Sequence, residues 1–262
     1  MRAHAALTPA DLGACDLTGR SAVVIDVFRA STTVVTAFVS GCRALIPVLT
    51  PEEARTRAKG FPADEVLLGG ERGGEPIPGF ELGNSPLQYT PERVGGKVVI
   101  FTTTNGTKAL VAASRAGATA VAGLVNLEAV AEWATAAGRD LTLVCSGEAG
   151  AVSLEDTVCA GILLETLDRT VTPLELTDAA RVCLIVAAHY RHRLERLLTE
   201  SFWARELLRL GHRDDLSTCL ALNVYAEVPT LRDGIVRRSG STANRSAAVL
   251  PSVSAVPGRR RV

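Results

Sequence analysis

The sequence of 262 residues contains no apolar run approaching the roughly 20 residues that a helix needs to span a bilayer. Its first residues, MRAHAALTPAD, lack the apolar core of a signal peptide. The chain also has no net charge, because 28 Lys and Arg residues balance 28 Asp and Glu residues. No global field would therefore attract nucleic acid or a membrane surface. We expect a cytoplasmic protein that acts on a small molecule, with any anion site formed locally.

The signature motifs of several common enzyme classes are missing as well. There is no G-x-x-x-x-G-K-[ST], no G-x-G-x-x-G after a strand and no G-x-S-x-G, so the sequence makes no case for a P-loop ATPase, a Rossmann enzyme or an α/β-hydrolase. The six cysteines include no C-x-x-C pair, which favours buried, reduced thiols over zinc or disulfides. Only Cys145 stays a candidate site residue, because it ends an expected strand. His189 and His192 have no acidic or cysteine motif nearby, which favours a helix surface over a metal site.

Short apolar runs alternate with helical patterns along the chain, and 47% hydrophobic residues are ample for a sizeable core. The expected strands are 22–25, 44–49, 65–68, 97–101, 120–125, 141–145 and, near the end, 224–231. The expected helices are 34–39, 51–60, 108–118, 127–138, 153–167, a helical pair over 177–211, and 214–223. This alternation predicts an α/β fold with a mainly parallel sheet covered by helices on both faces.

The same pattern predicts how the chain divides. We expect one α/β domain over residues 1–236, with the helical segment 177–223 packed on it. The remainder, 237–262, is rich in Ser, Ala, Pro and Arg and is expected to form a flexible tail.

The chain is organised around residues 20–33, RSAVVIDVFRASTT, where a buried strand runs into a polar turn. Asp26 ends the strand, and Ser31 or Thr32 is placed to cap the helix that follows. Asp26 is therefore expected at the carboxyl edge of the sheet, facing a helix N-terminus, where open α/β folds bind ligands. Burying an acid in this position costs free energy, which favours a functional role for Asp26. The structural alternative is an ion pair with Arg29.

Two further strand ends carry polar turns of the same kind: 102–107, TTTNGT, and 145–148, CSGE, which leads to SLED at 153–156. In a parallel sheet these turns share one edge. Short hydroxyl side chains, a glycine and backbone N–H groups ahead of a helix form an anion cradle, so TTTNGT is the candidate for phosphate binding. The alternative is an ordinary strand-to-helix turn in which Thr107 caps the helix and Gly106 adopts a positive φ.

Carboxylates near these turns offer the hard oxygen ligands that Mg²⁺ prefers beside a phosphate; they are Asp26, Glu71, Glu155 and Asp156. Structural alternatives exist, because Asp156 follows Ser153 at nearly the spacing of a capping box and Glu155 could be a solvated first-turn charge. Arg29 and Arg72 could grip a phosphate or sulfonate with their guanidinium groups, or pair with the acids.

Together, the motifs DVFRASTT, GER, GFELGNSP, TTTNGT and CSGEAGAVSLED resemble, in this order between about Ala22 and Pro229, those of the 2-phosphosulfolactate phosphatase family. The resemblance implies a three-layer α/β/α fold and a Mg²⁺-dependent phosphatase. The implied reaction hydrolyses (2R)-2-phospho-3-sulfolactate to 3-sulfolactate and phosphate, a step of coenzyme M biosynthesis in methanogens. Relatives also occur in many bacteria without that pathway.

Matching the chain to these motifs assigns roles to its residues as the resemblance implies them. The catalytic set is Asp26, Arg29 and Asp156, and the Mg²⁺ ligands come from Asp26, Glu71, Glu155 and Asp156. The residues expected to bind the substrate and its phosphate are Ser31, Thr32, Arg72, Asn84, Ser85, Thr103, Thr104, Asn105, Gly106, Thr107, Ser146 and Gly147.

Two positions depart from the family pattern, since Glu148 and Val152 stand where members favour Thr and Phe. An acid at position 148 would weaken the binding of a bis-anionic substrate unless it faces away from the site. Two alternatives therefore stay open: a phosphatase for another small phosphorylated hydroxy acid, and a non-catalytic anion-binding or regulatory protein on the same fold. The oligomeric state, including a homo-oligomer, is also left open by the sequence.

Overall fold

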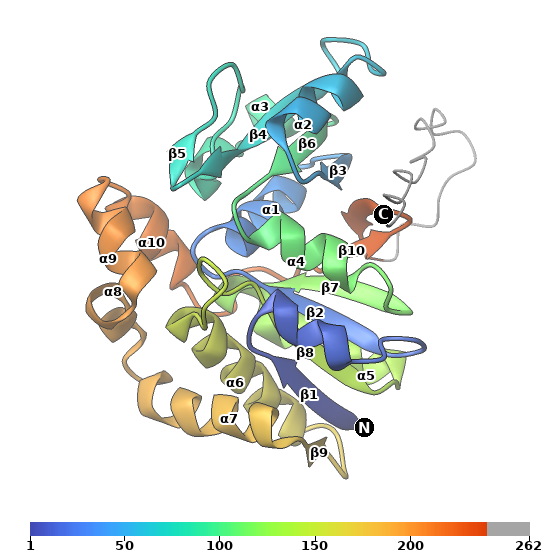
Figure 1. Ribbon diagram of the computed structural model, residues 1–262, viewed down its shortest axis with the longest axis vertical. Helices are drawn as coiled ribbons and strands as arrows, with labels where there is room; N and C mark the ends of the chain where they lie inside the picture. Colours follow the sequence, from blue (N-terminus) through green and yellow to red (C-terminus); the bar gives the residue numbers. More distant parts are fainter. Residues whose placement is uncertain (240–262) are drawn as a thin grey trace, which may run out of the picture.

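The computed structural model describes residues 1–239, whose strands form one mixed sheet in the order β5-β4-β6-β3-β11-β10-β7-β2-β8-β1-β9 (Figure 1). The strands are β1 Arg2–Ala6, β2 Ser21–Ile25, β3 Ala44–Pro47, β4 Val66–Arg72, β5 Glu75–Pro76, β6 Val98–Thr102, β7 Ala118–Ala122, β8 Leu141–Cys145, β9 Glu175–Leu176, β10 Pro229–Arg232 and β11 Ile235–Arg238. The tail expected at 237–262 therefore begins inside β11, and the rest of it, 240–262, lies outside the described residues.

Helices cover both faces of this sheet, which confirms the predicted α/β class. They are α1 Ala30–Val39, α2 Pro51–Ala58, α3 Pro91–Val94, α4 Gly106–Ala113, α5 Leu127–Ala137, α6 Leu154–Asp168, α7 Asp178–Tyr190, α8 Leu197–Glu200, α9 Phe202–Arg209 and α10 Arg213–Cys219. Within residues 1–239, none of these helices has both the length and the apolar character needed to cross a membrane.

Strand β2 shows how the two faces are built. All five of its residues are buried, as expected for a strand in the middle of a sheet that is covered on both sides. Val23 and Ile25 join the core formed with α5 and α6, whereas Ala22 and Val24 join the core formed with α1 and α4. The strand's period of two therefore distributes its apolar side chains over two separate hydrophobic layers.

The sheet is mainly parallel, as predicted, but not uniformly so. Strands β7, β2, β8, β1 and β9 form one parallel block and β4, β6 and β3 form another. The antiparallel hairpin β10–β11 joins them, pairing with β7 on one side and with β3 on the other. Three antiparallel steps separate the blocks, so their strands run in opposite directions.

The polar turns after β2 and β6 nevertheless meet. Adjacent strands twist by roughly 20–25°, so the steps from β2 to β6 accumulate on the order of 100° of rotation, which turns two nominally opposed strand ends toward each other. Direct contact across the blocks follows: the Asn105 amide, after β6, donates to Glu148, after β8, at 2.8 Å. The turns after β2 and β8 share one edge, as predicted, because these strands are parallel neighbours, whereas the turn after β6 reaches them from the other block.

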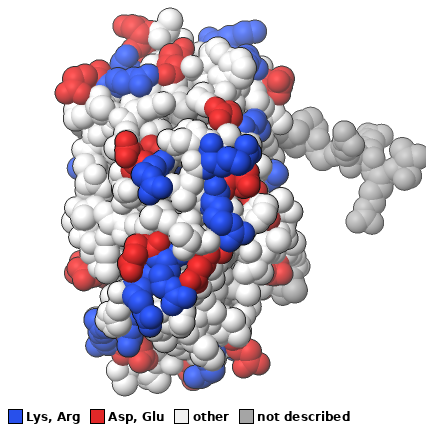
Figure 2. All heavy atoms as spheres, turned by 90° about the vertical axis from the view of Figure 1, so that its left-hand side faces the viewer, with Lys and Arg blue, Asp and Glu red and all other residues white. Residues whose placement is uncertain are grey.

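The C-terminal helices lie at the left of the molecule in Figure 1 and are more broken than the pattern at 177–211 predicts. Thr177 caps α7 by accepting a hydrogen bond from the backbone of Ala180, and Ser201 starts a separate helix, α9, by accepting one from the backbone of Ala204. On the face shown in Figure 2, acidic and basic side chains lie next to one another rather than in separate fields. Among the C-terminal helices, the ion pairs Arg196–Glu200 and Arg209–Glu206 link residues three or four positions apart.

Candidate active site

A pocket of about 380 Å³, counted to its open mouth, lies where the turns after β2, β4, β6 and β8 meet α6 and α9. The predicted site residues that line it are Asp26, Arg29, Glu71, Asn84, Thr104, Asn105, Gly147, Glu155 and Asp156. The lining residues absent from the predicted site set are Phe28, Glu148, Ser153 and Trp203. The predicted site residues outside this lining are Ser31, Thr32, Arg72, Ser85, Thr103, Gly106, Thr107 and Ser146.

Asp26 itself organises the start of α1. Its Oδ1 accepts a hydrogen bond from the backbone N–H of Ala30 at 3.3 Å, and its carbonyl accepts one from Ser31 N–H at 2.9 Å. The expected cap was wrong: the helix already begins at Ala30, so Ser31 and Thr32 lie in its first turn. The Ser31 hydroxyl instead accepts from the backbone N–H of Asp26, and that of Thr32 donates to the Val27 carbonyl.

The turn TTTNGT differs from the expected strand-to-helix turn, because Asn105 and not Thr107 is the N-cap of α4. Thr103 and Thr107 hold each other, because each accepts through its hydroxyl from the other's backbone N–H at 3.2 and 3.1 Å. Thr104 N–H donates to Glu71 Oε1 at 2.7 Å. These three amides are committed to the protein itself, which leaves those of Asn105 and Gly106, at the start of α4, as candidates for an anion.

Gly106 is required for a different reason from the one the sequence suggested. Its φ is not positive. A Cβ at this position would instead lie 2.6 Å from Asp26 Oδ2 and 2.8 Å from the Ala30 Cβ. The glycine therefore lets the N-termini of α1 and α4 approach each other around the Asp26 carboxylate, where both helix dipoles favour negative charge.

Glu71 and Arg72 point in different directions because they lie in a strand, not in the loop that the sequence suggested. Strand β4 continues to Arg72 by pairing with β5 around Gly73 and Gly74, whose φ values of 58° and 87° suit a two-residue hairpin turn. Successive side chains of a strand alternate in direction. Glu71 accordingly lines the pocket, whereas Arg72 donates to the Leu49 carbonyl and to Thr102 Oγ1 at 3.0 and 2.8 Å.

Asp156 bridges two of the turns. Its Oδ1 accepts from Val27 N–H at 2.9 Å, after β2, and its Oδ2 accepts from Gly147 N–H at 3.2 Å, after β8. Ser153 caps α6 by accepting from Asp156 N–H, which is half of the expected capping box. The Asp156 carboxylate does not return a hydrogen bond to the backbone of Ser153, as it would in a complete capping box. It instead holds the turns after β2 and β8 against the start of α6.

These acids repel one another in a place that water reaches poorly. Burial raises the pKa of Asp26 to about 7, with the nearby charge of Glu71 adding to the shift. The pKa of Asp156 is raised well above its ordinary value by burial and by Asp26, and burial also raises the pKa of Glu155. Arg29 is the pocket's cationic side chain within residues 1–239, so much of the negative charge of the site is uncompensated.

Glu148 adds a further acid to the pocket and does not face away from it. The two-residue turn Ala149–Gly150, with φ values of 50° and 82°, folds the loop into a small hairpin in which Glu148 and Ala151 exchange backbone hydrogen bonds. Asn105 Nδ2 holds the Glu148 carboxylate at 2.8 Å. Burial, followed by the charge of Glu71, raises the pKa of Glu148. Neighbouring Cys145, in contrast, is fully buried with a raised pKa and stays a protonated core thiol.

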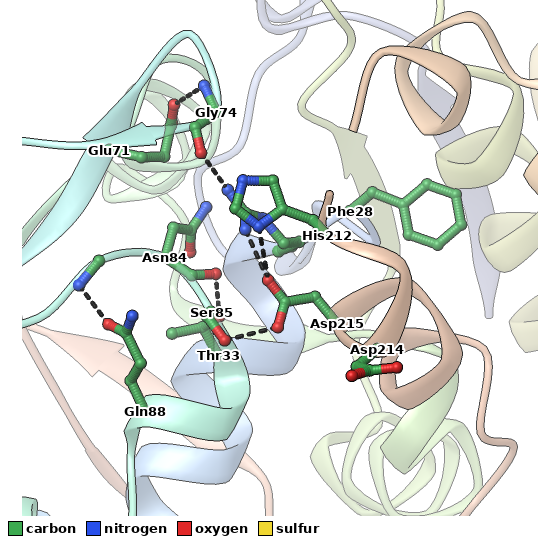
Figure 3. A network of polar contacts seen from close by, with 12 residues as sticks. Phe28, Thr33, Glu71, Gly74, Asn84, Ser85, Gln88, His212, Asp214 and Asp215 are labelled. Carbon is green, nitrogen blue, oxygen red and sulfur yellow. Dashed lines mark hydrogen bonds and ion pairs between the residues drawn. The ribbon is translucent and has the colours of Figure 1, made fainter. Parts of the chain in front are cut away.

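Arg29 is held by partners that the sequence did not reveal (Figure 3). Its Nη1 donates to Asp215 Oδ2 and its Nη2 donates to the Gly74 carbonyl, both at 2.6 Å. The Ser85 hydroxyl donates to the other Asp215 oxygen at 2.5 Å. Arg29 and Asp215 are 2% and 4% exposed, so this is a buried ion pair. The pair joins α10 to the pocket.

The residues present fit Mg²⁺. The donors are hard oxygens, and buried Asn84 Oδ1 has no hydrogen-bond partner among residues 1–239, so one more oxygen is left to a ligand. No three His, Cys, Asp or Glu side chains of this part of the chain converge as a complete metal cage. Mg²⁺ commonly uses only one or two carboxylates and completes its shell with water and substrate oxygens, so this arrangement suits it. Asp26, Glu71, Glu155 and Asp156 are the candidates.

Comparison with known proteins agrees with the motifs. The sequence model of the 2-phosphosulpholactate phosphatase family matches residues 6–234. A relative from Symbiobacterium thermophilum, named "Probable 2-phosphosulfolactate phosphatase", is 42% identical over 84% of this chain and 95% of its own length. Relatives of the same name from Caldanaerobacter subterraneus subsp. tengcongensis and Thermotoga maritima are each 38% identical, over 86% and 82% of this chain and 92% and 91% of their own lengths. The chain therefore belongs to the 2-phosphosulfolactate phosphatase family.

Proposed function

We propose that the protein is a Mg²⁺-dependent phosphatase that hydrolyses (2R)-2-phospho-3-sulfolactate to (R)-3-sulfolactate and phosphate. The family supports the reaction and the substrate. The observation that carries the proposal is the meeting of acids with the N-termini of α1, α4 and α6 in one pocket. Acids attract a cation and helix N-termini attract an anion, so the combination suits a metal ion beside a phosphate.

In this proposal Asp26, with Asp156 or Glu71, would hold Mg²⁺. When bound, the ion would neutralise charge on the phosphoryl oxygens as a Lewis acid. The backbone N–H groups of Asn105 and Gly106 would orient the same oxygens, since they lie at the start of α4.

Arg29 and Asp26 supply the remaining chemistry. Two of the five N–H donors of the Arg29 guanidinium are used by Asp215 and Gly74, which leaves others to stabilise negative charge on the phosphoryl group. Asp26 Oδ2 would orient the attacking water and take its proton as the new P–O bond forms. The ester P–O bond breaks, the departing alkoxide takes up a proton from solvent to give the alcohol, and Asp26 releases to solvent the proton that it took.

Glu148 favours a second candidate: a phosphatase for a less anionic phosphorylated hydroxy acid. The (2R)-2-phospho-3-sulfolactate molecule carries a carboxylate and a sulfonate besides its phosphate, and Glu148 lines the pocket that would receive them. A like charge in a partly desolvated site opposes such a ligand. A hydroxyl in place of the sulfonate could donate a hydrogen bond to the same carboxylate.

The test is phosphate release from (2R)-2-phospho-3-sulfolactate and from a panel of phosphorylated hydroxy acids, each with Mg²⁺ and with EDTA. We expect turnover that EDTA abolishes and the highest kcat/KM for phosphosulfolactate. A higher kcat/KM for a less anionic ester would favour the second candidate. Metal-independent turnover, or no turnover of any phosphate ester, would refute the proposal.

A further inference from the structure

We propose that Asp215, on α10, is a positioning residue that holds the Arg29 guanidinium toward the phosphoryl group and away from the acids of the pocket. The inference rests on the proposed function only in taking a phosphoryl group as the ligand of Arg29. It assigns the C-terminal helices a part in the active site, beyond covering the sheet.

An arginine without such an anchor would find other partners in this pocket. Guanidinium groups bind carboxylates through paired, charge-assisted hydrogen bonds. Asp26 stands three residues before Arg29, and Glu71 lies just across the Gly74 peptide, whose N–H donates to Glu71 Oε2 at 2.8 Å while its carbonyl accepts from Arg29 at 2.6 Å. An ion pair with Asp26 or Glu71 would remove both the anion-binding arginine and a potential metal ligand.

Asp215 is itself fixed on both oxygens. Oδ1 accepts from the Ser85 hydroxyl at 2.5 Å, Oδ2 accepts from Arg29 at 2.6 Å, and His212 Nδ1 lies 3.4 Å from Oδ2. A carboxylate with both oxygens engaged and little solvent has one orientation, and so does the guanidinium attached to it. Figure 3 shows Ser85 and His212 close to the Asp215 carboxylate.

A second contact from the neighbouring helix acts on the residue before Arg29. The Trp203 indole Nε1, on α9, donates to the Phe28 carbonyl at 2.9 Å. Both Trp203 and Phe28 line the pocket. Two consecutive helices, α9 and α10, therefore hold two consecutive residues of the turn after β2. The contact between Asp215 and Arg29 is thus one of two that fix this turn.

The chain offers a matched control beside Asp215. Asp214 is on the same helix, one residue earlier, and is exposed. Its side chain points away from the network in Figure 3. Asp214→Asn removes the same charge from the same helix without affecting the contact with Arg29. Comparing the two variants therefore separates the effect of that contact from the effect of the helix's net charge.

The experiment measures binding of inorganic phosphate by calorimetry in MgCl₂, together with kcat and KM. We expect Asp215→Asn to weaken phosphate binding about tenfold, a loss typical of one charge-assisted contact, while Asp214→Asn stays within about twofold. Arg29→Lys should also lose affinity, and the double variant should bind no more weakly than Arg29→Lys alone, because Asp215 acts through Arg29. Asp215→Glu should recover part of the affinity.

Two results would overturn the inference: phosphate binding by Asp215→Asn within twofold of the wild type, or additive losses in the double variant. If Asp215→Asn does not fold, Ser85→Ala is the milder test, since it frees only one oxygen of Asp215; an expected loss of about threefold supports the inference and an unchanged affinity contradicts it. A wild type that binds phosphate but hydrolyses no ester would refute the proposed function and leave the binding test of Asp215 intact.

Discussion

On one side of the pocket, Asp26, Glu155 and Asp156 form no ion pair with any Lys, Arg or His of residues 1–239, whereas on the other side Arg29 forms an ion pair with Asp215. The unpaired acids all have raised pKa values. Keeping several like charges together is costly in a folded protein unless a ligand relieves them. This difference supports the proposal of a cation on the acidic side and of an anion beside Arg29.

The largest effect on activity is expected from removing an acid on the acidic side of the pocket. Asp26→Asn removes the charge between the N-termini of α1 and α4 while preserving the shape of the side chain. We expect kcat to fall by about 10³-fold, as for the loss of a general base. Measured in the same assay, Asp64→Asn, an exposed acid outside the pocket, should keep wild-type kcat. Near-normal turnover by Asp26→Asn would show that the Asp26 carboxylate is not needed for the reaction.

A second change displaces the same acid without altering its charge. In Gly106→Ala, the new Cβ must move the Asp26 carboxylate, because the space between them is only 2.6 Å. Misplacement of a reacting group by about 1 Å costs roughly 10²-fold in rate. Kinetics of this variant should be compared with Gly13→Ala, where a Cβ meets nothing within 4 Å. Equal kcat/KM in both variants would show that the position of Asp26 is unimportant.

A smaller change lowers the negative charge at the rim of the pocket. Glu148→Gln keeps an acceptor for the Asn105 amide but removes the like charge. We expect KM for phosphosulfolactate to fall about fivefold at low salt, with less difference at high salt because of screening. Steady-state kinetics at two ionic strengths will measure this. A KM that rises would mean that the Glu148 charge assists binding.

The smallest effect concerns stability. The folded protein keeps a proton on Asp26 up to pH 7 or so, whereas the unfolded chain loses it near the ordinary pKa of 3.8. Between these values the folded state binds more protons, so the free energy of unfolding falls as pH rises. Asp26→Asn should therefore raise Tm by about 3 °C at pH 8 in EDTA and leave it unchanged near pH 3.5. Thermal unfolding at both pH values provides the measurement.

The turns that depend on local sequence could be predicted. Asp26 at the end of β2 and Ser153 and Asp156 at the start of α6 follow from apolar runs ending in polar, capping residues. The hairpin β10–β11 also has a local signal in the sequence: Asp233–Gly234, with φ values of 51° and 75°, between strands that contain Leu231 and Ile235. With that hairpin recognised, the reversal within the sheet could have been anticipated.

The partner of Arg29 could not be predicted in this way. Asp215 follows another acid in the first turn of a short helix, where an exposed, dipole-stabilising charge is the ordinary expectation. It is 186 residues from Arg29, and only tertiary packing brings the two together. The same holds for Trp203, whose contact with Phe28 depends on how α9 lies against the turn.

The position of β10 and β11 has a consequence for how the protein is made. These are the last strands described, yet they fill the centre of the sheet between the two blocks. While a ribosome still holds residues 229–238, the nascent chain carries two partial sheets whose inner edges, β7 and β3, have no neighbour to pair with. Closure of the sheet must therefore wait until residues 229–238 have been made, and it joins segments distant in sequence, which slows this stage and leaves both edges exposed until it is complete.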